Sequence, residues 1–148
     1  GPQGADENSA PAELLLKGVY GIRTLAEPSA TWIKDQATLT ELYHKLNARH
    51  GGKDKISPQI DFKQFGVLFL ETGQKPSGGF AINFDDTKTR TADGQLEIHA
   101  SWKDPPEGMA VTQAVTSPFL LLKIKSKDLT SILVLDQNNR SLFEVPIN

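Results

Sequence analysis

The sequence predicts an α+β domain, mainly antiparallel β, with seven to eight strands in a sandwich or open barrel and one α-helix packed on one side. Two observations support this fold class. Short segments that are apolar or that alternate between apolar and polar residues recur along most of the chain, and such segments are typical of strands. A segment with a helical period occurs once, so the parallel crossovers that need a helix between strands are not expected.

The strands follow from these segments in chain order. They are residues 14–24, 65–70, 80–84, 96–102, 119–124, 132–135 and 142–145. The sequences FGVLFL and FLLLKI in the second and fifth segments are almost continuously apolar, which indicates central strands buried on both faces. A turn around Asn138 and Asn139 joins the last two segments, and because asparagine tolerates positive φ we expect a hairpin there.

The helix is predicted over residues 38–50. Its apolar positions fall at i, i+3, i+4 and i+7, which is one helical face: Leu39, Leu42, Tyr43 and Leu46. Thr38 and Glu41 match a capping box, in which each side chain bonds the backbone N–H of the other's position. Gly51 and Gly52 provide the stop, because glycine adopts the left-handed conformation freely.

Length and composition limit the possible classes of protein. The 148 residues suit one domain, which we expect over residues 13–148. Residues 1–12 are polar and contain two prolines, so we expect a disordered tail there. Its first two residues, Gly1-Pro2, are typical of the scar of a cleaved purification tag.

Charge and residue usage exclude several functions. A net charge of −2 disfavours a general nucleic-acid binder, which would carry a basic excess. The absence of cysteine excludes disulfides, thiolate catalysis and thiolate metal sites. No apolar run approaches the roughly 20 residues that a membrane-spanning helix needs. We expect neither a cofactor nor a metal.

The stretch GQKPSGG resembles a phosphate-binding loop at first sight. Gly73 and Gly78 have the glycine spacing of G-x-x-x-x-G-K-[ST], but Gly79 and Phe80 occupy the positions of the lysine and the serine or threonine. The following segment alternates as a strand, so no helix N-terminus is offered to an anion. The stretch is therefore interpreted as a tight structural turn or as a loop that binds a protein.

Histidine chemistry has three candidates. His44 lies on the polar side of the helix and His50 at its end, where solvation and helix termination explain them. His99 shares one strand face with Glu97 and Ser101, but residues two apart on a strand are separated by about 6.8 Å. Triad partners must lie within about 2.6–3.2 Å. A polar stripe is therefore favoured over catalysis, and the histidine spacing matches no H-E-x-x-H metal motif.

Two further features have both a structural and a functional interpretation. Lys123, Lys125 and Lys127 alternate along the end of one strand. They indicate a solvated face or a guarded sheet edge, or alternatively a basic stripe for an acidic partner. Trp102 ends a predicted strand beside a Pro-Pro loop. A core position is the default interpretation, and an anchor for a partner is the alternative.

Two segments, GQKPSGGFAI at residues 73–82 and TQAVTSPFLLLKI at residues 112–124, resemble the PrcB family. These are small bacterial domains named after an accessory subunit of a cell-surface protease complex. The family has a G-x-K-P-[ST]-G-G-[YF] loop after an apolar strand, and later a Thr-Gln followed by [TS]-P-[YF] and a second apolar strand. The resemblance covers roughly residues 56–126.

This resemblance implies a non-enzymatic, exported domain that is periplasmic or attached to the cell envelope, with a lipid anchor possible in the precursor. It implies a protein partner, such as a protease or another envelope protein, and a role in assembly or regulation of a protease complex. The motif positions are Lys75, Pro76, Ser77, Gly78, Gly79, Phe80, Gln113, Thr116, Ser117, Pro118 and Phe119. We expect these residues and Trp102 to contact the partner.

The first motif is also similar, more faintly, to the N-P-T-T-G-Y loop of chagasin-like inhibitors of cysteine proteases, which are immunoglobulin-like β proteins. Lys75 replaces the asparagine, Ser77-Gly78 replaces Thr-Thr and Phe80 replaces the tyrosine. No R-P-W-type motif accompanies the loop. A protease inhibitor is therefore the alternative function, and a small hydrolase is the third.

Overall fold

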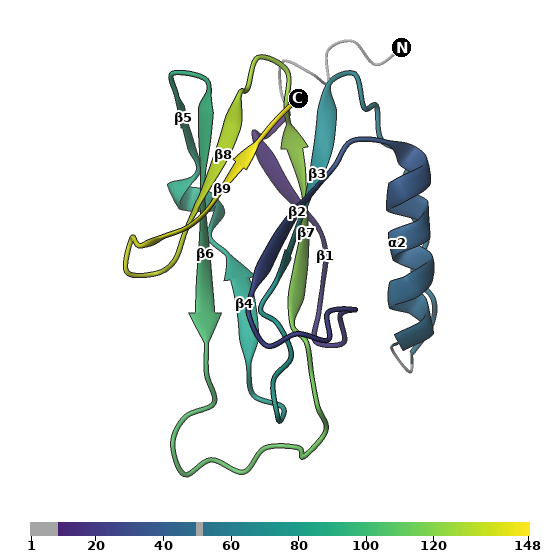
Figure 1. The fold of residues 1–148 in the computed structure, drawn as a ribbon, viewed down its shortest axis with the longest axis vertical. Helices are drawn as coiled ribbons and strands as arrows, with labels where there is room; N and C mark the ends of the chain where they lie inside the picture. The colour runs from purple at the N-terminus through teal and green to yellow at the C-terminus, as the bar shows by residue number, and fades with distance from the viewer. Residues whose placement is uncertain (1–8, 50–51) are drawn as a thin grey trace.

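The computed structural model describes residues 9–49 and 52–148, which form a helix, a four-stranded sheet and a second sheet in three layers (Figure 1). The strands are β1 (Ala12–Gly18), β2 (Ser29–Ile33), β3 (Phe65–Glu71), β4 (Ala81–Phe84), β5 (Arg90–Ala92), β6 (Gln95–Lys103), β7 (Phe119–Lys125), β8 (Ser131–Leu135) and β9 (Ser141–Pro146). The helices are α2 (Gln36–Arg49) and the short 3-10 helix η1 (Asp86–Lys88). The predicted class, α+β and mainly β, is confirmed, with nine strands rather than seven or eight.

The first sheet has the strand order β1-β7-β3-β2 and is antiparallel throughout. Its two middle strands are the apolar runs that the sequence predicts to be central, and every residue of β3 is buried. Successive side chains of a strand point to opposite faces, so Val67 and Phe69 pack toward α2 while Leu68 and Leu70 pack toward the second sheet. Burial on both faces of the sheet explains the continuous apolar sequence.

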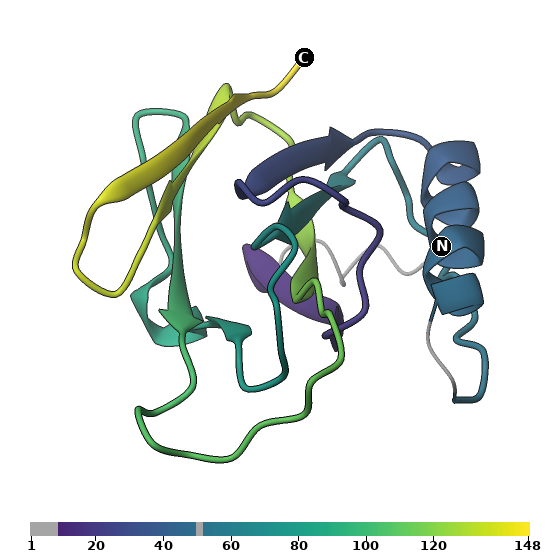
Figure 2. The same ribbon diagram turned by 60° about the horizontal axis from the view of Figure 1, so that its bottom comes forward.

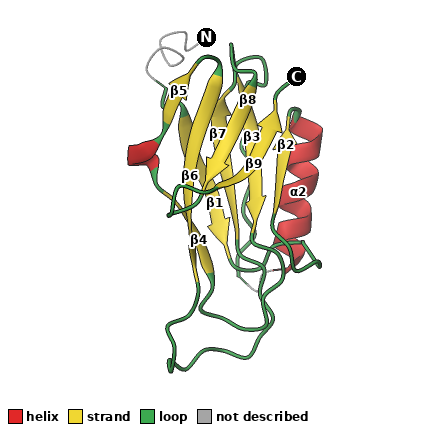
Figure 3. Ribbon diagram, turned by 60° about the vertical axis from the view of Figure 1, so that its left-hand side comes forward, coloured by secondary structure: helices red, strands yellow, loops and turns green. Residues whose placement is uncertain are grey.

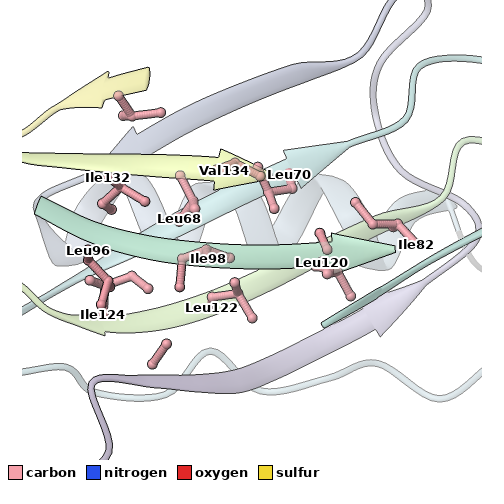
Figure 4. Close-up of a cluster of buried hydrophobic side chains, with 13 residues drawn as sticks. Leu68, Leu70, Ile82, Leu96, Ile98, Leu120, Leu122, Ile124, Ile132 and Val134 are labelled. Carbon is pink, nitrogen blue, oxygen red and sulfur yellow. The ribbon is translucent and has the colours of Figure 1, made fainter. Parts of the chain in front are cut away.

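The second sheet has the order β4-β6-β8-β9, and β5 also pairs with β6. It faces the first sheet across a core of interleaved aliphatic side chains (Figure 4). The first sheet contributes Leu68, Leu70, Leu120, Leu122 and Ile124, and the second contributes Ile82, Leu96, Ile98, Ile132 and Val134. The arrangement is a sandwich and not a closed barrel (Figure 3).

One strand pair departs from the expected antiparallel pattern. β6 and β8 are parallel, with Leu96 opposite Ile132 and Ile98 opposite Val134. The chain between them passes through β7 of the first sheet instead of through a helix. A strand in the facing sheet therefore replaces the helical crossover on which the antiparallel expectation rested. The final hairpin between β8 and β9 is confirmed, and Asn139 has a φ of 60° in its turn.

Helix α2 packs its predicted apolar face against the first sheet, since Leu39, Leu42, Tyr43 and Leu46 are all buried there. Its start differs from the prediction. The helix begins at Gln36, and the Oδ1 atom of Asp35 accepts a hydrogen bond of 2.8 Å from the backbone N–H of Thr38. The capping box at Thr38 is therefore wrong, and Asp35 is the cap. The predicted end at His50 and Gly51 lies outside the described residues.

The N-terminal and lysine features also differ from the sequence interpretation. The predicted tail lies mostly outside the described residues, and β1 begins at Ala12 and ends at Gly18 instead of continuing to residue 24. β7, which carries Lys123 and Lys125, runs between β1 and β3, so the guarded-edge interpretation is wrong. The Lys123 Nζ lies 4.1 Å from the Phe65 ring centroid. In the described part of the chain, no helix is long and apolar enough to cross a membrane.

Candidate functional site

Three loops gather at one end of the sandwich, at the bottom of Figure 1 and turned forward in Figure 2. They are residues 19–28, 72–80 and 104–118, and we call them together the loop end. Isolated bridges link Tyr20 with Ser117 and Lys75 with Thr116. The N–H of Gln74 also donates to the Leu25 carbonyl at 2.8 Å, so each loop contacts the other two, and both sequence motifs meet at this end.

Backbone hydrogen bonds fasten the first motif to the second. The N–H of Lys75 donates to the Thr116 carbonyl at 2.8 Å, and the N–H of Thr116 donates to the Lys75 carbonyl at 3.0 Å. The Thr116 hydroxyl donates to the Ser77 carbonyl at 2.8 Å. The N–H of Gly78 donates to the Thr112 carbonyl at 2.9 Å. The two motifs, about 40 residues apart in the chain, therefore form one structural unit.

The double glycine is required by crowding and by backbone conformation. Gly79 has a φ of +91°, and a Cβ there would lie 2.6 Å from the Pro105 Cβ and 2.9 Å from the Val111 Cγ1. A Cβ on Gly78 would lie 2.4 Å from the Thr112 hydroxyl oxygen. Side chains at these two positions would push the loops of residues 72–80 and 104–118 apart. The glycines therefore serve loop-to-loop packing.

The tip of the first motif is accessible. Pro76 is exposed, and Phe80 is half-buried outside both core clusters. The Lys75 Nζ lies 5.2 Å from the Phe80 ring centroid, within the range of a cation–π contact. Ile82 and Phe84 join the inter-sheet core. The predicted strand of residues 80–84 therefore starts one residue later, at Ala81, and Phe80 belongs to the loop.

The second motif is mainly buried. Gln113 is exposed, whereas Thr116, Ser117, Pro118 and Phe119 are buried beneath the loop end. The Phe119 ring packs edge-on to that of Phe69 at 6.0 Å between centroids. These four residues support the loops from below and have little surface to offer a partner.

Trp102 lies next to the loop end, opposite Ile82 of the first motif segment in the pairing of β4 with β6. It is half-buried at the end of β6 and packs against the inter-sheet core. Its backbone N–H donates to the Gln137 Oε1 at 2.9 Å, and the Gln137 Nε2 donates to the Trp102 carbonyl at 3.0 Å. This reciprocal pair joins β6 to the turn between β8 and β9. The environment matches the default interpretation of Trp102 as a core residue.

Glu71 is an important residue of this end that the sequence interpretation missed. It is 4% exposed at the end of β3, and its Oε2 accepts hydrogen bonds from the backbone N–H groups of Ile22 at 3.2 Å and Arg23 at 2.9 Å. Burial raises the pKa of Glu71, although these hydrogen bonds and the Arg23 charge oppose the rise. A carboxylate that ends the apolar run FGVLFL was the available signal. Glu71 fixes the loop of residues 19–28.

The candidate catalytic trio is only partly assembled. The Glu97 Oε2 lies 3.2 Å from the His99 Nε2 and 3.0 Å from the Arg90 Nε. The hydrogen bond from His99 lowers the pKa of Glu97, and the Arg90 charge adds to this effect. In the described part of the chain, Ser101 forms no hydrogen bond with His99, so Ser101 does not complete the trio.

The other histidines and acids add no metal site within residues 9–49 and 52–148. There, no group of three or more His, Asp or Glu side chains is placed to hold a metal ion. His44 is exposed on α2, and His50 lies outside the described residues.

Comparison with known proteins supports the motif resemblance. The model of the PrcB C-terminal family matches residues 67–125. Over this segment the chain is PrcB-like. The PrcB-like segment runs from β3 through both motifs to the end of β7, so it contains the fastened loops of the site and two central strands. No curated protein and no solved structure matches the chain significantly.

Proposed function

We propose that this PrcB-like chain is a non-enzymatic domain that binds a protein component of a protease complex through its loop end. The observation that carries the proposal is the fastening of the two family motifs into one unit whose tip, including Pro76 and Gln113, is exposed. A preorganised loop loses less conformational entropy when it binds. Such a tip is suited to recognising a protein surface.

The distribution of apolar surface supports the same end. Seven large hydrophobic residues are exposed in the described part of the chain, and five of them belong to the loop end. These five are Val19, Tyr20, Leu25, Met109 and Val115. Exposed apolar residues that gather in one region are characteristic of interaction sites, whereas scattered ones are normal. Burial of this group by a partner would supply binding free energy.

The test is recovery of partners by the purified chain from an envelope extract. Pro76→Arg places a charge on the exposed tip without removing a backbone hydrogen bond, because proline donates none. We expect recovery of a protease-complex component by the wild type and a loss of about tenfold with Pro76→Arg, as for a central interface residue. Lys127→Glu, beyond the far end of β7, is the control. Equal recovery with all three proteins would contradict the proposal.

We also propose that the native protein is exported to the periplasm or the cell envelope, on the strength of the PrcB-like segment. Fractionation of cells that express the native precursor tests this part separately. The protein is expected in the periplasmic or membrane fraction, with lipid labelling if a lipid anchor is present. Recovery only in the cytoplasmic fraction would refute export and leave the binding proposal standing.

A protease inhibitor remains the second candidate. The observation that favours it is the presentation of the Pro76 loop at one end of a two-sheet sandwich with a loop on each side. Papain activity, titrated with the purified chain, separates the two functions. Nanomolar inhibition that Pro76→Arg removes would support the inhibitor. Full papain activity at micromolar protein would exclude it for this class of protease.

A small hydrolase is the third candidate, because Glu97 and His99 are in contact. Hydrolysis of p-nitrophenyl esters by the wild type and His99→Ala provides the measurement. The proposal of a non-enzymatic domain expects both proteins to match the uncatalysed rate. A wild-type rate well above background that His99→Ala abolishes would refute it.

A further inference from the structure

A hollow of about 230 Å³ lies beside the loop end, between β1 and the C-terminal half of α2. A helix is about 10 Å wide and strands are about 4.8 Å apart, so one helix covers roughly two strands. Helix α2 packs mainly on β3 and β7, which leaves the flank over β1 open. The apolar lining of this β1 hollow consists of Leu16, Val19, Tyr20, Leu46 and Phe119.

One lysine adds positive charge to the β1 hollow. Lys17 and Lys55 both line it, and no carboxylate does. The Asn47 side chain holds the Lys55 backbone through two hydrogen bonds of 2.9 Å, one in each direction. The Lys17 Nζ donates to the Asn83 amide oxygen on β4 of the second sheet, so its charge lies away from the hollow, and Lys55 supplies the positive charge there. Among the described residues neither lysine forms an ion pair. The hollow therefore combines apolar walls with positive charge that lacks a carboxylate partner.

The opposite flank of α2 provides an internal comparison. A hollow of about 260 Å³ lies there, over β2. Its charged residues already have partners. The Lys45 Nζ lies 3.6 Å from the Glu41 Oε1, and Glu71 accepts two backbone hydrogen bonds. Both flanks are open because one helix covers roughly two strands. Of these two hollows, only the β1 hollow has a charged side chain without a partner among the described residues.

The β1 hollow is continuous with the loop end. Val19 and Tyr20 belong to both, and the N–H of Ser117 donates to the Val19 carbonyl at 2.8 Å. The preceding residue, Thr116, bonds to Lys75 of the first motif. A partner seated on the loop end would therefore reach the hollow without crossing another element.

We propose that the β1 hollow receives one large apolar side chain of the partner, and that an acidic residue beside that side chain contacts Lys55. This inference rests on the proposed function and names the chemistry of the partner segment. The volume is below the roughly 300–1,000 Å³ of sites for drug-sized ligands and suits a single aromatic or aliphatic side chain. Buried apolar anchors dominate binding energy, and complementary charges around them confer specificity.

The test uses the full chain and a synthetic probe, the acetylated and amidated pentapeptide Asp-Glu-Phe-Glu-Asp. Its binding is followed through the backbone amide NMR signals of the protein at peptide concentrations up to about 2 mM, which detects millimolar affinity. Two control peptides carry alanine in place of phenylalanine, or lysines in place of all four acids. We expect shifts at Tyr20, Asn47 and Phe119, with at least tenfold weaker binding of both control peptides.

Matched protein variants test the charge. Lys55→Glu should weaken binding of the acidic probe about tenfold, whereas Lys127→Glu, the same change at the far end of β7, should leave it unchanged. The dispersion of the amide signals verifies that each variant is folded. Binding of the lysine peptide as strong as that of the acidic probe would overturn the inference, and so would the absence of shifts around the hollow.

Failure of this inference and failure of the proposed function give different results. If Pro76→Arg abolishes partner recovery while the probe leaves the hollow signals unmoved, the hollow is overturned and the proposed function stands. If the probe binds the hollow as expected while Pro76→Arg recovers partners normally, the anchoring chemistry is supported and the loop end is refuted as the contact surface.

Discussion

At the scale of single residues, Glu71 shows how one buried carboxylate organises a surface loop. Its Oε2 accepts the backbone N–H groups of Ile22 and Arg23, which would otherwise be unpaired beneath the loop end. The carboxylate is itself nearly inaccessible to water, and its pKa is raised because burial disfavours the charged form. Its acceptor atoms therefore matter more to the fold than its charge.

This distinction gives a prediction for two variants. Glu71→Gln keeps an acceptor oxygen and removes the buried charge, so its free energy of unfolding at pH 7 should equal or exceed that of the wild type. Glu71→Ala leaves two N–H groups without an acceptor and should lose about 1–3 kcal/mol. Urea unfolding at pH 7 measures both. A Glu71→Gln variant as unstable as Glu71→Ala would show that the charge itself is essential.

The difference in stability between Glu71→Gln and the wild type should depend on pH, and the sign of this dependence can be derived. Because the folded-state pKa of Glu71 is raised above its ordinary value of 4.5, its protonation adds stability that is fully present below about pH 4.5. This stability is lost as the pH rises through the folded-state pKa. Glu71→Gln should therefore gain stability relative to the wild type between pH 4 and pH 8. Urea unfolding across this range tests it, and a gain by the wild type instead would reverse the assignment.

Substitution of two glycines of the loop end distinguishes the stability cost of backbone strain from that of side-chain crowding. Gly79 has a φ of +91° and is crowded by Pro105 and Val111, whereas Gly108 has a φ of +79° and no atom within 4 Å of the position that a Cβ would take. Alanine at either position adopts an unfavourable φ, but Gly79→Ala must also displace neighbouring side chains. We expect Gly108→Ala to lose about 1 kcal/mol and Gly79→Ala about 1–3 kcal/mol more. Equal losses in thermal unfolding would show that packing contributes nothing.

At the scale of elements, sequence periodicity locates α2 better than sequence motifs locate its start. The four apolar positions are all buried, but the Thr38 capping box is replaced by Asp35. Both residues are good N-cap types, and the periodic apolar positions begin too late to choose between them. The packing of α2 on the first sheet makes that choice, because it sets where the helix axis must begin.

The assignment of Asp35 as the N-cap of α2 gives a testable prediction. The hydrogen bond from the Thr38 backbone lowers the pKa of Asp35, so the ionised side chain is the stabilising form. Asp35→Ala should lower Tm by a few degrees at pH 7, and Thr38→Ala should change it little. The difference between Asp35→Ala and the wild type should shrink as the pH falls through the folded-state pKa. Thermal unfolding of both variants is the measurement, and a larger loss for Thr38→Ala would contradict the cap assignment.

The strands show where local patterns stop being informative. β3 and β7 were predictable because they are apolar on both faces, which requires burial on both sides. β2 and β5 were missed, because β5 is three exposed residues and β2 lies at a sheet edge. The parallel pairing of β6 with β8 depends on β7 joining the other sheet, which is a global property of the topology.

At the scale of the whole molecule, the sequence predicts which two motifs belong to the candidate site. It does not predict which of their residues are exposed. The sequence identified both segments but placed Thr116, Ser117, Pro118 and Phe119 on the same footing as Pro76. The fold separates them, because the residues entering β7 are buried and the turn of the first motif projects outward. The β1 hollow was not predictable, since it arises from the width of α2 relative to the sheet.

The central claim is that a protein partner contacts the loop end, and site-specific photocrosslinking in native cells tests it most directly. A photoreactive amino acid replaces Pro76 or Gln113 at the loop end, or Lys127 at the opposite end of β7, since all three are exposed. The account predicts one adduct of the same mass from Pro76 and Gln113, containing a protease-complex component, and none from Lys127. Adducts from Lys127 alone, or equally from both ends, would contradict it.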